Sequence, residues 1–400
     1  MEQEKTSPIE RVVAKMRQSV VLRLLVIGIL ILILLIPTGM LESLISEREY
    51  SHNQAVKEIS GKWGDEQTIT GPVIAIPYYY DEKDDKGRVT SQKSYMYYLP
   101  DDVHITGDLK SEKRHRGIYE AVLYESNMHV SGSFGAGFLN ATSELPSTAV
   151  LKDARVLVGI SDVRGIRNSV KLMWDGAAVG AQPGAKDEVV SAGINFPIGN
   201  FDLQKGGKFD FDLDLAGSGS IDFTPVGKTS VVDITSKWPS PSFFGAFLPT
   251  TDTITKEGFK AEWKVLELNR NFNQSWAGDN KEVFHGSDFG VKMFVPADEY
   301  QKSHRSVHYC ILFIALTFIF YFIIELRSGA SVNPVQYLLI GLAISIFYLL
   351  LLSMSEWLGF NTAFFISAAA VTMLISLFFQ SVLLLVDTFR SGFLTTAFIK

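Results

Sequence analysis

The sequence predicts an α+β membrane protein with an N-terminal anchor helix, a large β-rich, sandwich-like domain on the trans side of the membrane and a C-terminal transmembrane helical bundle. Four apolar runs reach the length needed to cross a bilayer. The residues between the first and second run, 42–305, contain no comparable stretch. With 47% hydrophobic residues and a mean hydropathy of +0.16, the chain is also intermediate between a soluble enzyme and an all-membrane transporter.

The first apolar run, residues 20–41, predicts transmembrane helix 1, and residues 1–19 form a cytoplasmic N-terminus. Only Arg23 interrupts the run, and its long side chain can reach the near interface. A cleaved signal peptide is the alternative, but that would have an apolar core of about 7–15 residues and a cleavage site with small residues. Residues 36–40 (IPTGM) offer no such site. We therefore expect an anchor that is retained.

Residues 42–305 predict a β-rich domain outside the membrane, because short alternating segments recur between Gly, Pro, Asn and Asp residues. Regular spacing of this kind is typical of a sandwich or a pair of packed sheets. Residues 42–62 are an exception and predict a juxtamembrane helix. Candidate strands cover residues 72–80, 93–99, 118–130, 154–160, 169–174, 209–215, 230–235, 259–268 and 289–295.

The C-terminal part predicts three further transmembrane helices and a cytoplasmic tail. The helices cover residues 306–326, 337–355 and 361–387, and the tail covers residues 388–400. Lys and Arg crowd the N-terminal side of the first helix, whereas Glu residues dominate just beyond it. The positive-inside rule therefore places the N-terminus in the cytoplasm and the large domain on the trans side, as expected for a multi-pass membrane protein.

Composition excludes several classes of protein. The formal net charge of −6 and the absence of a basic stripe interleaved with aromatics argue against nucleic acid as a partner. A single cysteine, Cys310, can form neither a disulfide framework nor a Cys-based zinc site. No motif for catalysis or for a cofactor occurs, so we expect no catalytic, cofactor-binding or metal-binding residues and no enzyme activity.

One acidic segment could be read as a calcium site. Asp210, Asp212 and Asp214 alternate with apolar residues along a predicted strand. An EF-hand loop requires Gly at its sixth position and Glu at its twelfth, but Leu215 and Ile221 stand there. A solvated strand face is therefore the favoured interpretation.

Polar residues in the apolar runs have two interpretations. Ionisable groups at membrane depth are costly and often functional. Glu325, Glu356 and Asp387, however, fall at helix ends, where they can reach the interface, and we favour that interpretation. Small residues at helical spacing predict helix-packing seams. These candidate packing residues are Gly341, Ser345, Ala368, Thr372 and Ser376.

Residues 238–249 (WPSPSFFGAFLP) form a segment rich in proline and aromatic residues, which predicts a rigid loop rather than a central strand. The loop could simply close one end of the sandwich core. Alternatively, its side chains form an apolar patch that docks on the bilayer surface or on a partner. The candidate interaction residues are Trp238, Phe243, Phe244 and Phe247.

Several stretches make the chain resemble the CreD family of bacterial inner-membrane proteins. They are residues 71–77 (GPVIAIP), 238–249, 296–301 (PADEYQ), 333–341 (NPVQYLLIG) and 347–356 (FYLLLLSMSE). The resemblance covers residues from about 20 to 380 and is not recognisable over 387–400. It implies a role in cell-envelope integrity and envelope stress, with no established reaction or cofactor. It also implies that the family's last two membrane helices are missing from this chain.

Two hypotheses about function follow. The favoured one is a non-catalytic envelope protein, embedded in the lipid bilayer, whose periplasmic domain binds an unknown envelope component or membrane protein. The alternative is a polytopic transport-type or enzymatic protein that acts through its helical bundle, which requires ionisable residues near the bilayer midplane.

Overall fold

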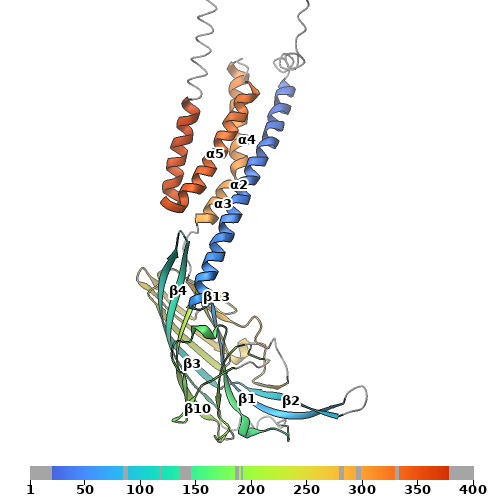
Figure 1. Ribbon diagram of the computed structural model, residues 1–400, viewed down its shortest axis with the longest axis vertical. Helices are drawn as coiled ribbons and strands as arrows, with labels where there is room; N and C mark the ends of the chain where they lie inside the picture. The colour runs from blue at the N-terminus through green and yellow to red at the C-terminus, as the bar shows by residue number, and fades with distance from the viewer. Residues whose placement is uncertain are drawn as a thin grey trace, which may run out of the picture. The chain divides into compact units, whose positions relative to one another are not determined.

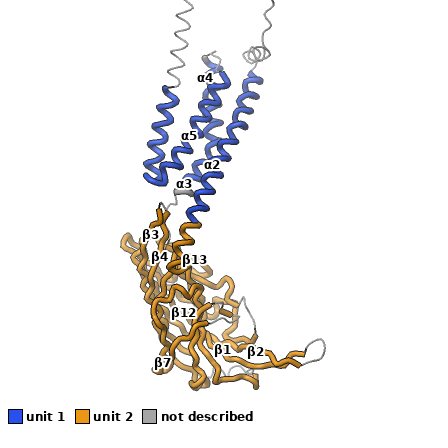
Figure 2. The backbone as a smooth tube through the Cα atoms, viewed as in Figure 1, with its two compact units in different colours: residues 1–53, 297–400 blue, residues 54–296 orange. Residues whose placement is uncertain are grey.

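The computed structural model describes residues 20–83, 89–117, 119–135, 146–184, 189–190, 192–278, 283–293, 299–328 and 333–377. The chain divides into two compact units (Figure 2). Residues 1–53 and 297–400 make up the helical unit, and residues 54–296 make up the β-rich unit. The predicted cytoplasmic segments 1–19 and 388–400 lie outside the described residues, as does the end of the predicted fourth transmembrane helix, from residue 378.

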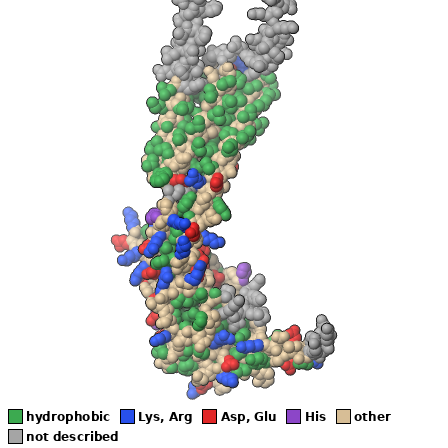
Figure 3. Space-filling model, viewed as in Figure 1, with side chains coloured by type: hydrophobic (Ala, Val, Ile, Leu, Met, Phe, Trp, Pro, Cys, Tyr) green, Lys and Arg blue, Asp and Glu red, His purple; other side chains and the backbone are tan. Residues whose placement is uncertain are grey.

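The helical unit is built from long apolar helices (Figure 1). These are α2 (Val20–Trp63), whose last turns belong to the β-rich unit, α4 (Cys310–Ser328), α5 (Pro334–Leu358) and the helix Phe360–Leu377. A short polar helix, α3 (Glu299–His308), precedes α4. Within the described residues, four helices are long and apolar enough to cross a membrane: Val20–Trp63, Lys302–Arg327, Pro334–Leu358 and Phe360–Leu377. Figure 3 shows hydrophobic side chains over the visible face of this unit, whereas charged side chains gather on the β-rich unit.

Local sequence explains where α5 begins and ends. Asn333 accepts a hydrogen bond from the Val335 N–H (3.1 Å), and the Asn333 N–H donates to the Gln336 side chain (3.2 Å). This is a reciprocal cap, and Pro334 follows at the first helical position, where its missing N–H costs nothing. Gly359 ends the helix with a φ of 73°, a conformation that glycine adopts without strain.

The C-terminal end of α2 is fixed within the β-rich unit. Arg164 donates to the carbonyl of Gly61 (2.7 Å) and Arg167 to the carbonyl of Trp63 (3.3 Å), which satisfies acceptors that a helix end leaves open. The guanidinium groups of Arg114 and Arg167 lie 4.8 Å and 4.4 Å from the Trp63 ring. The predicted juxtamembrane segment is thus the second part of one continuous helix rather than a separate helix.

The β-rich unit contains two sheets (Figure 1). The nine-stranded sheet A has the order β13-β17-β11-β1-β5-β9-β8, with β2 on β1 and β16 on β2. Its strands are β1 (Gln67–Lys83), β2 (Val89–Tyr98), β5 (Arg155–Ile160), β8 (Gln182–Pro183), β9 (Gly193–Pro197), β11 (Ser220–Thr224), β13 (Pro241–Gly245), β16 (Ser275–Ala277) and β17 (Phe289–Met293).

The eight-stranded sheet B has the order β14-β15-β12-β3-β4-β10-β6-β7. Its strands are β3 (Asp102–Arg116), β4 (Tyr119–Phe134), β6 (Lys171–Trp174), β7 (Ala177–Gly180), β10 (Gly207–Ser218), β12 (Thr229–Ser236), β14 (Thr251–Thr255) and β15 (Gly258–Leu266). Most neighbours are antiparallel, but β1 pairs with β11 and β3 pairs with β12 in parallel. Short 3-10 helices occupy Leu151–Asp153, Val163–Gly165 and Glu267–Asn269.

One apolar core joins the two sheets. It contains Ile74 and Phe289 from sheet A together with Phe211 and Trp263 from sheet B, all essentially inaccessible to solvent. The strands alternate between this core and the outside, as β12 shows with a half-buried, buried pattern along its whole length. All nine sequence-predicted strands overlap a strand of the structure, so the prediction of a large β-rich region is confirmed.

A polar cluster lies on the outer face of sheet A, opposite the core. Asp222 and Thr224 alternate with the buried Ile221 and Phe223 along β11. Thr224 donates to Asp288 (2.6 Å). Burial and the carboxylates of Asp288 and Glu66 raise the pKa of Asp222 to about 7. The folded chain therefore holds a proton on Asp222 at a pH where the unfolded chain has lost it.

This shift predicts how Asp222 affects stability with pH. The pKa of Asp222 is about 7 in the folded chain and about 4 in the unfolded chain. The contribution of Asp222 to stability is therefore complete below about pH 4 and is lost as the pH rises through about 7. We expect Asp222→Asn to raise the free energy of unfolding by roughly 1–4 kcal/mol at pH 8, with the gain shrinking as the pH falls towards about 4. Thermal unfolding of the parent and the variant across this pH range measures the gain. A gain that does not change with pH would contradict the role of Asp222.

Candidate functional site

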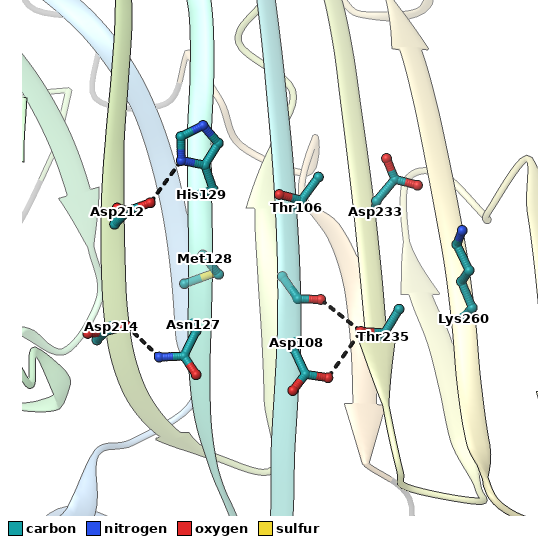
Figure 4. A pocket seen from close by; sticks show the side chains of 11 residues that line it. Thr106, Asp108, Asn127, Met128, His129, Asp212, Asp214, Asp233, Thr235 and Lys260 are labelled. Carbon is teal, nitrogen blue, oxygen red and sulfur yellow. Dashed lines mark hydrogen bonds and ion pairs between the residues drawn. The ribbon is translucent and has the colours of Figure 1, made fainter. Parts of the chain in front are cut away.

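The outer face of sheet B carries a polar groove with a volume of about 660 Å³. Outward-facing positions of five adjacent strands, β10, β4, β3, β12 and β15, supply most of its lining (Figure 4). These residues are far apart in the sequence, and the strand register brings them together: Asp212 pairs with His129, and Asp214 pairs with Asn127. The lining residues are Thr106, Gly107, Asp108, Asn127, Met128, His129, Asp212, Asp214, Asp233, Thr235 and Lys260.

Short hydrogen bonds hold the side chains of the groove. Asp212 contacts Nδ1 of His129 at 2.8 Å. Asp214 accepts from the amides of Asn168 and Asn127, both at 2.5 Å, and these two bonds lower the pKa of its carboxyl group. These bonds hold the acceptor oxygens of Asp212 and Asp214 at fixed positions in the groove.

A second group of contacts lies across the groove. Thr235 donates to the carboxylate of Asp108 (3.1 Å) and approaches the carbonyl of Gly107 (3.3 Å). Beside it, Asp233 is 2.9 Å from Nε2 of His104. Four aspartates and one lysine line the groove, so the lining is acidic at neutral pH.

The side chains of the groove form hydrogen-bonded polar pairs. Asp212 and His129 form an exposed pair. Among the residues that the structure describes, no group of three or more His, Cys, Asp or Glu side chains could hold a metal ion. Asp210, Asp212 and Asp214 lie on the outer face, as expected for a solvated strand.

The proline-rich and aromatic segment 238–249 lies mainly against the core. Trp238 is 8% exposed and belongs to the core cluster, and Phe243 and Phe247 pack against it. Phe243 contacts Trp263 edge to face, with ring centroids 5.5 Å apart. Phe244 is half-buried and is not part of this cluster. The prediction of a loop is wrong for residues 241–245, which form strand β13, because Pro241 stands first in an edge strand, where its missing N–H breaks no ladder.

These contacts predict that Phe243 is structural. Phe243→Ala removes the packing on Trp263 and Phe259, and we expect a loss of roughly 2–4 kcal/mol in the free energy of unfolding. Phe244→Ala is the matched control on the neighbouring residue and should cost clearly less. Denaturant unfolding of the two variants measures the difference, and equal losses would contradict the assignment.

The predicted helix-packing residues have different surroundings. Gly341 lies against the neighbouring helices, because a Cβ built there would fall 2.2 Å from Leu34 and 3.2 Å from Phe318. Ser345 is buried and donates to the Gly341 carbonyl (3.1 Å). Ala368 is half-buried, whereas Thr372 and Ser376 are exposed. On that last helix, the buried side chains are Ala363, Ser367 and Val371, one turn apart in succession.

The structure shows a polar contact between helices that the sequence did not predict. Glu325 on α4 is 4% exposed and contacts Arg23 on α2 at 3.3 Å. Tyr337 on α5 donates to the other carboxylate oxygen (3.1 Å). We expected Glu325 and Arg23 each to reach the interface separately. The sequence did contain a signal for this contact, because Arg23 and Glu325 carry opposite charges at similar depths in two apolar runs.

Two further ion pairs lie at the opposite end of the helices. Arg48 contacts Glu356 at 3.5 Å, and His308 contacts Glu42 at 3.9 Å. Residues 23 and 42 are about 29 Å apart along a helix, close to the thickness of the hydrocarbon core. Since α2 meets the end of α4 near residue 23 and the end of α5 near residue 48, α4 runs antiparallel to α2 and α5 runs parallel to it.

The fold and these sites define a membrane protein with several candidate spans and a large β-rich region. The chain matches the model of the family described as "Inner membrane protein CreD" over residues 19–398. It is also 32% identical over 360 residues to Inner membrane protein CreD of Escherichia coli (strain K12), across 88% of this chain and 79% of that protein. The chain therefore belongs to the CreD family of inner membrane proteins.

This match confirms the predicted resemblance and corrects its extent. The family model continues to residue 398, whereas we expected the resemblance to end near residue 380. Among solved structures, an M1 zinc metallopeptidase from Deinococcus radiodurans is similar at 9% identity and a TM-score of 0.18, covering 42% of this chain and 38% of that one. A similarity this weak supports no conclusion about function.

Proposed function

We propose that this chain is a non-catalytic inner-membrane protein that supports cell-envelope integrity and tolerance of envelope stress. Its β-rich domain lies in the periplasm and binds an envelope component or another membrane protein. The groove on sheet B is the observation that carries this proposal. It is wide, open and acidic, and its side chains are held in place by hydrogen bonds.

A hydrogen-bonded polar surface of this kind suits a polar or cationic partner. Charged side chains that are already ordered lose little further conformational entropy when a partner binds. Complementary charge also speeds the encounter and excludes partners of the wrong sign. The groove lies on the solvated face of a sheet whose other face forms the core, so its aspartates contribute little to folding.

The proposal predicts a separation between stability and function. We expect the double variant Asp212→Asn/Asp214→Asn to keep the melting temperature of the parent within a few degrees, because exposed pairs contribute about 0–1 kcal/mol. In cells lacking the native protein, the variant should fail to restore growth under envelope stress.

The matched control is Asp210→Asn/Asp252→Asn, which removes two exposed aspartates of sheet B that do not line the groove. This control should restore growth fully. If the groove variant restores growth fully, or if both variants lose it equally, the groove has no specific role in the function.

Orientation is the second part of the proposal. The Lys and Arg residues before α2 support a cytoplasmic N-terminus, and the alternating directions of α2, α4 and α5 fit successive crossings of the membrane. We expect reporters fused after Gly64 and after Glu299 to be active in the periplasm, and one fused at Lys400 to be active in the cytoplasm. A cytoplasmic signal at either of the first two positions would contradict this layout.

The buried carboxylate of Glu325 favours a second candidate, a transport-type or enzymatic protein that uses its helices. A buried ion pair is weak support for stability and often marks a proton or ion pathway. Exchange of the charges, Arg23→Glu/Glu325→Arg, distinguishes the candidates. If the pair only joins helices, each single variant should lose growth under stress and the exchange should restore it. Failure of a stably produced exchange variant favours the transport-type candidate.

A further inference from the structure

A second groove lies among the membrane helices, between α4, α5 and the helix Phe360–Leu377. Its volume is about 440 Å³, and it is lined mainly by aromatic and aliphatic side chains. Phe313 and Phe364 line it while remaining 54% and 40% exposed. From Ser306 to Thr317 the groove follows α3 and α4 over about 16 Å of helix length. It is therefore long, apolar and open towards the surroundings of the helices.

One end of this groove is polar. Ser306 and Tyr309 line it where α3 passes into α4, close to the end at which Arg48 and Glu356 pair. Lys302 lies one helical turn before Ser306, on the same face of α3. Its ammonium group is 5.8 Å from the Phe360 ring, which in turn stacks on Phe364 at 6.2 Å. A cation and a hydroxyl group thus lie beside the polar end.

We propose that this groove holds one acyl chain of a phospholipid with an anionic headgroup, whose phosphate meets Lys302 and Ser306. The groove is apolar along its length and polar at one end, as an acyl chain and its headgroup are. The positive charge of Lys302 complements the negative charge of the phosphate. Tyr309 lies near the end of the apolar span, and tyrosine is enriched at such positions because they fall at the membrane interface. This site is independent of the groove on sheet B.

The test uses the full-length protein in detergent and native mass spectrometry with added phosphatidylglycerol or phosphatidylcholine. We expect the parent protein to retain one phosphatidylglycerol in preference to phosphatidylcholine. Lys302→Gln should reduce this preference roughly fivefold, the effect of one basic residue beside an anionic lipid. Arg327→Gln, which removes a basic residue at the other end of α4, should leave it unchanged.

A second pair of variants tests the acyl-chain position. Ala368→Phe fills the groove and should abolish lipid retention, whereas Ala369→Phe adds the same ring at the next, exposed position and should retain it. If Ala368→Phe does not fold, Lys302→Gln alone decides. Equal retention of both lipids by the parent protein, an unchanged preference in Lys302→Gln, or equal loss in the two phenylalanine variants overturns the proposal.

Discussion

The alternation of side chains along the strands is the constraint on which the β-rich unit depends. Because strands such as β10 and β12 turn every second residue inward, their apolar side chains join the core between the sheets, with Leu213 and Val232 fully buried. The intervening residues then have to face outward. The groove on sheet B is a direct result, since Asp212, Asp214 and Asp233 occupy the positions next to those buried residues. The core and the candidate site therefore both result from the same alternation of side chains.

Sequence reasoning succeeded where this alternation is regular and failed where it is not. The segment 209–215 alternates strictly and was predicted as a strand, which the structure confirms as part of β10. Strand β3 was missed, because its second half, from Lys110 to Arg116, is charged and exposed and lacks the apolar partner positions. Strand β13 was also missed, since its prolines and aromatics fit a loop equally well until the edge of the sheet is known.

The candidate sites could not be predicted because they depend on register and on contacts between distant segments. Asp212 and Asp214 are recognisable in the sequence as one solvated strand face, but only the pairing of β10, β4, β3 and β12 brings Asp108 and Asp233 into the same surface. Glu325 illustrates the same limit. Its position at a helix end predicted access to the interface, but Arg23 and Tyr337 arrive from two other helices and enclose it.

The parallel pairings have a consequence for the folding kinetics of the β-rich unit. In sheet A, β1 pairs with β11, and Gln67 lies opposite Ile221; in sheet B, β3 pairs with β12, and Asp102 lies opposite Thr229. Both early strands lie inside their sheets, so neither sheet is complete until much later segments have been synthesised. Contacts of such long sequence separation slow folding, and unpaired strand edges remain exposed meanwhile. The edges of β1 and β3 that pair with β11 and β12 therefore stay open until those two strands have been made.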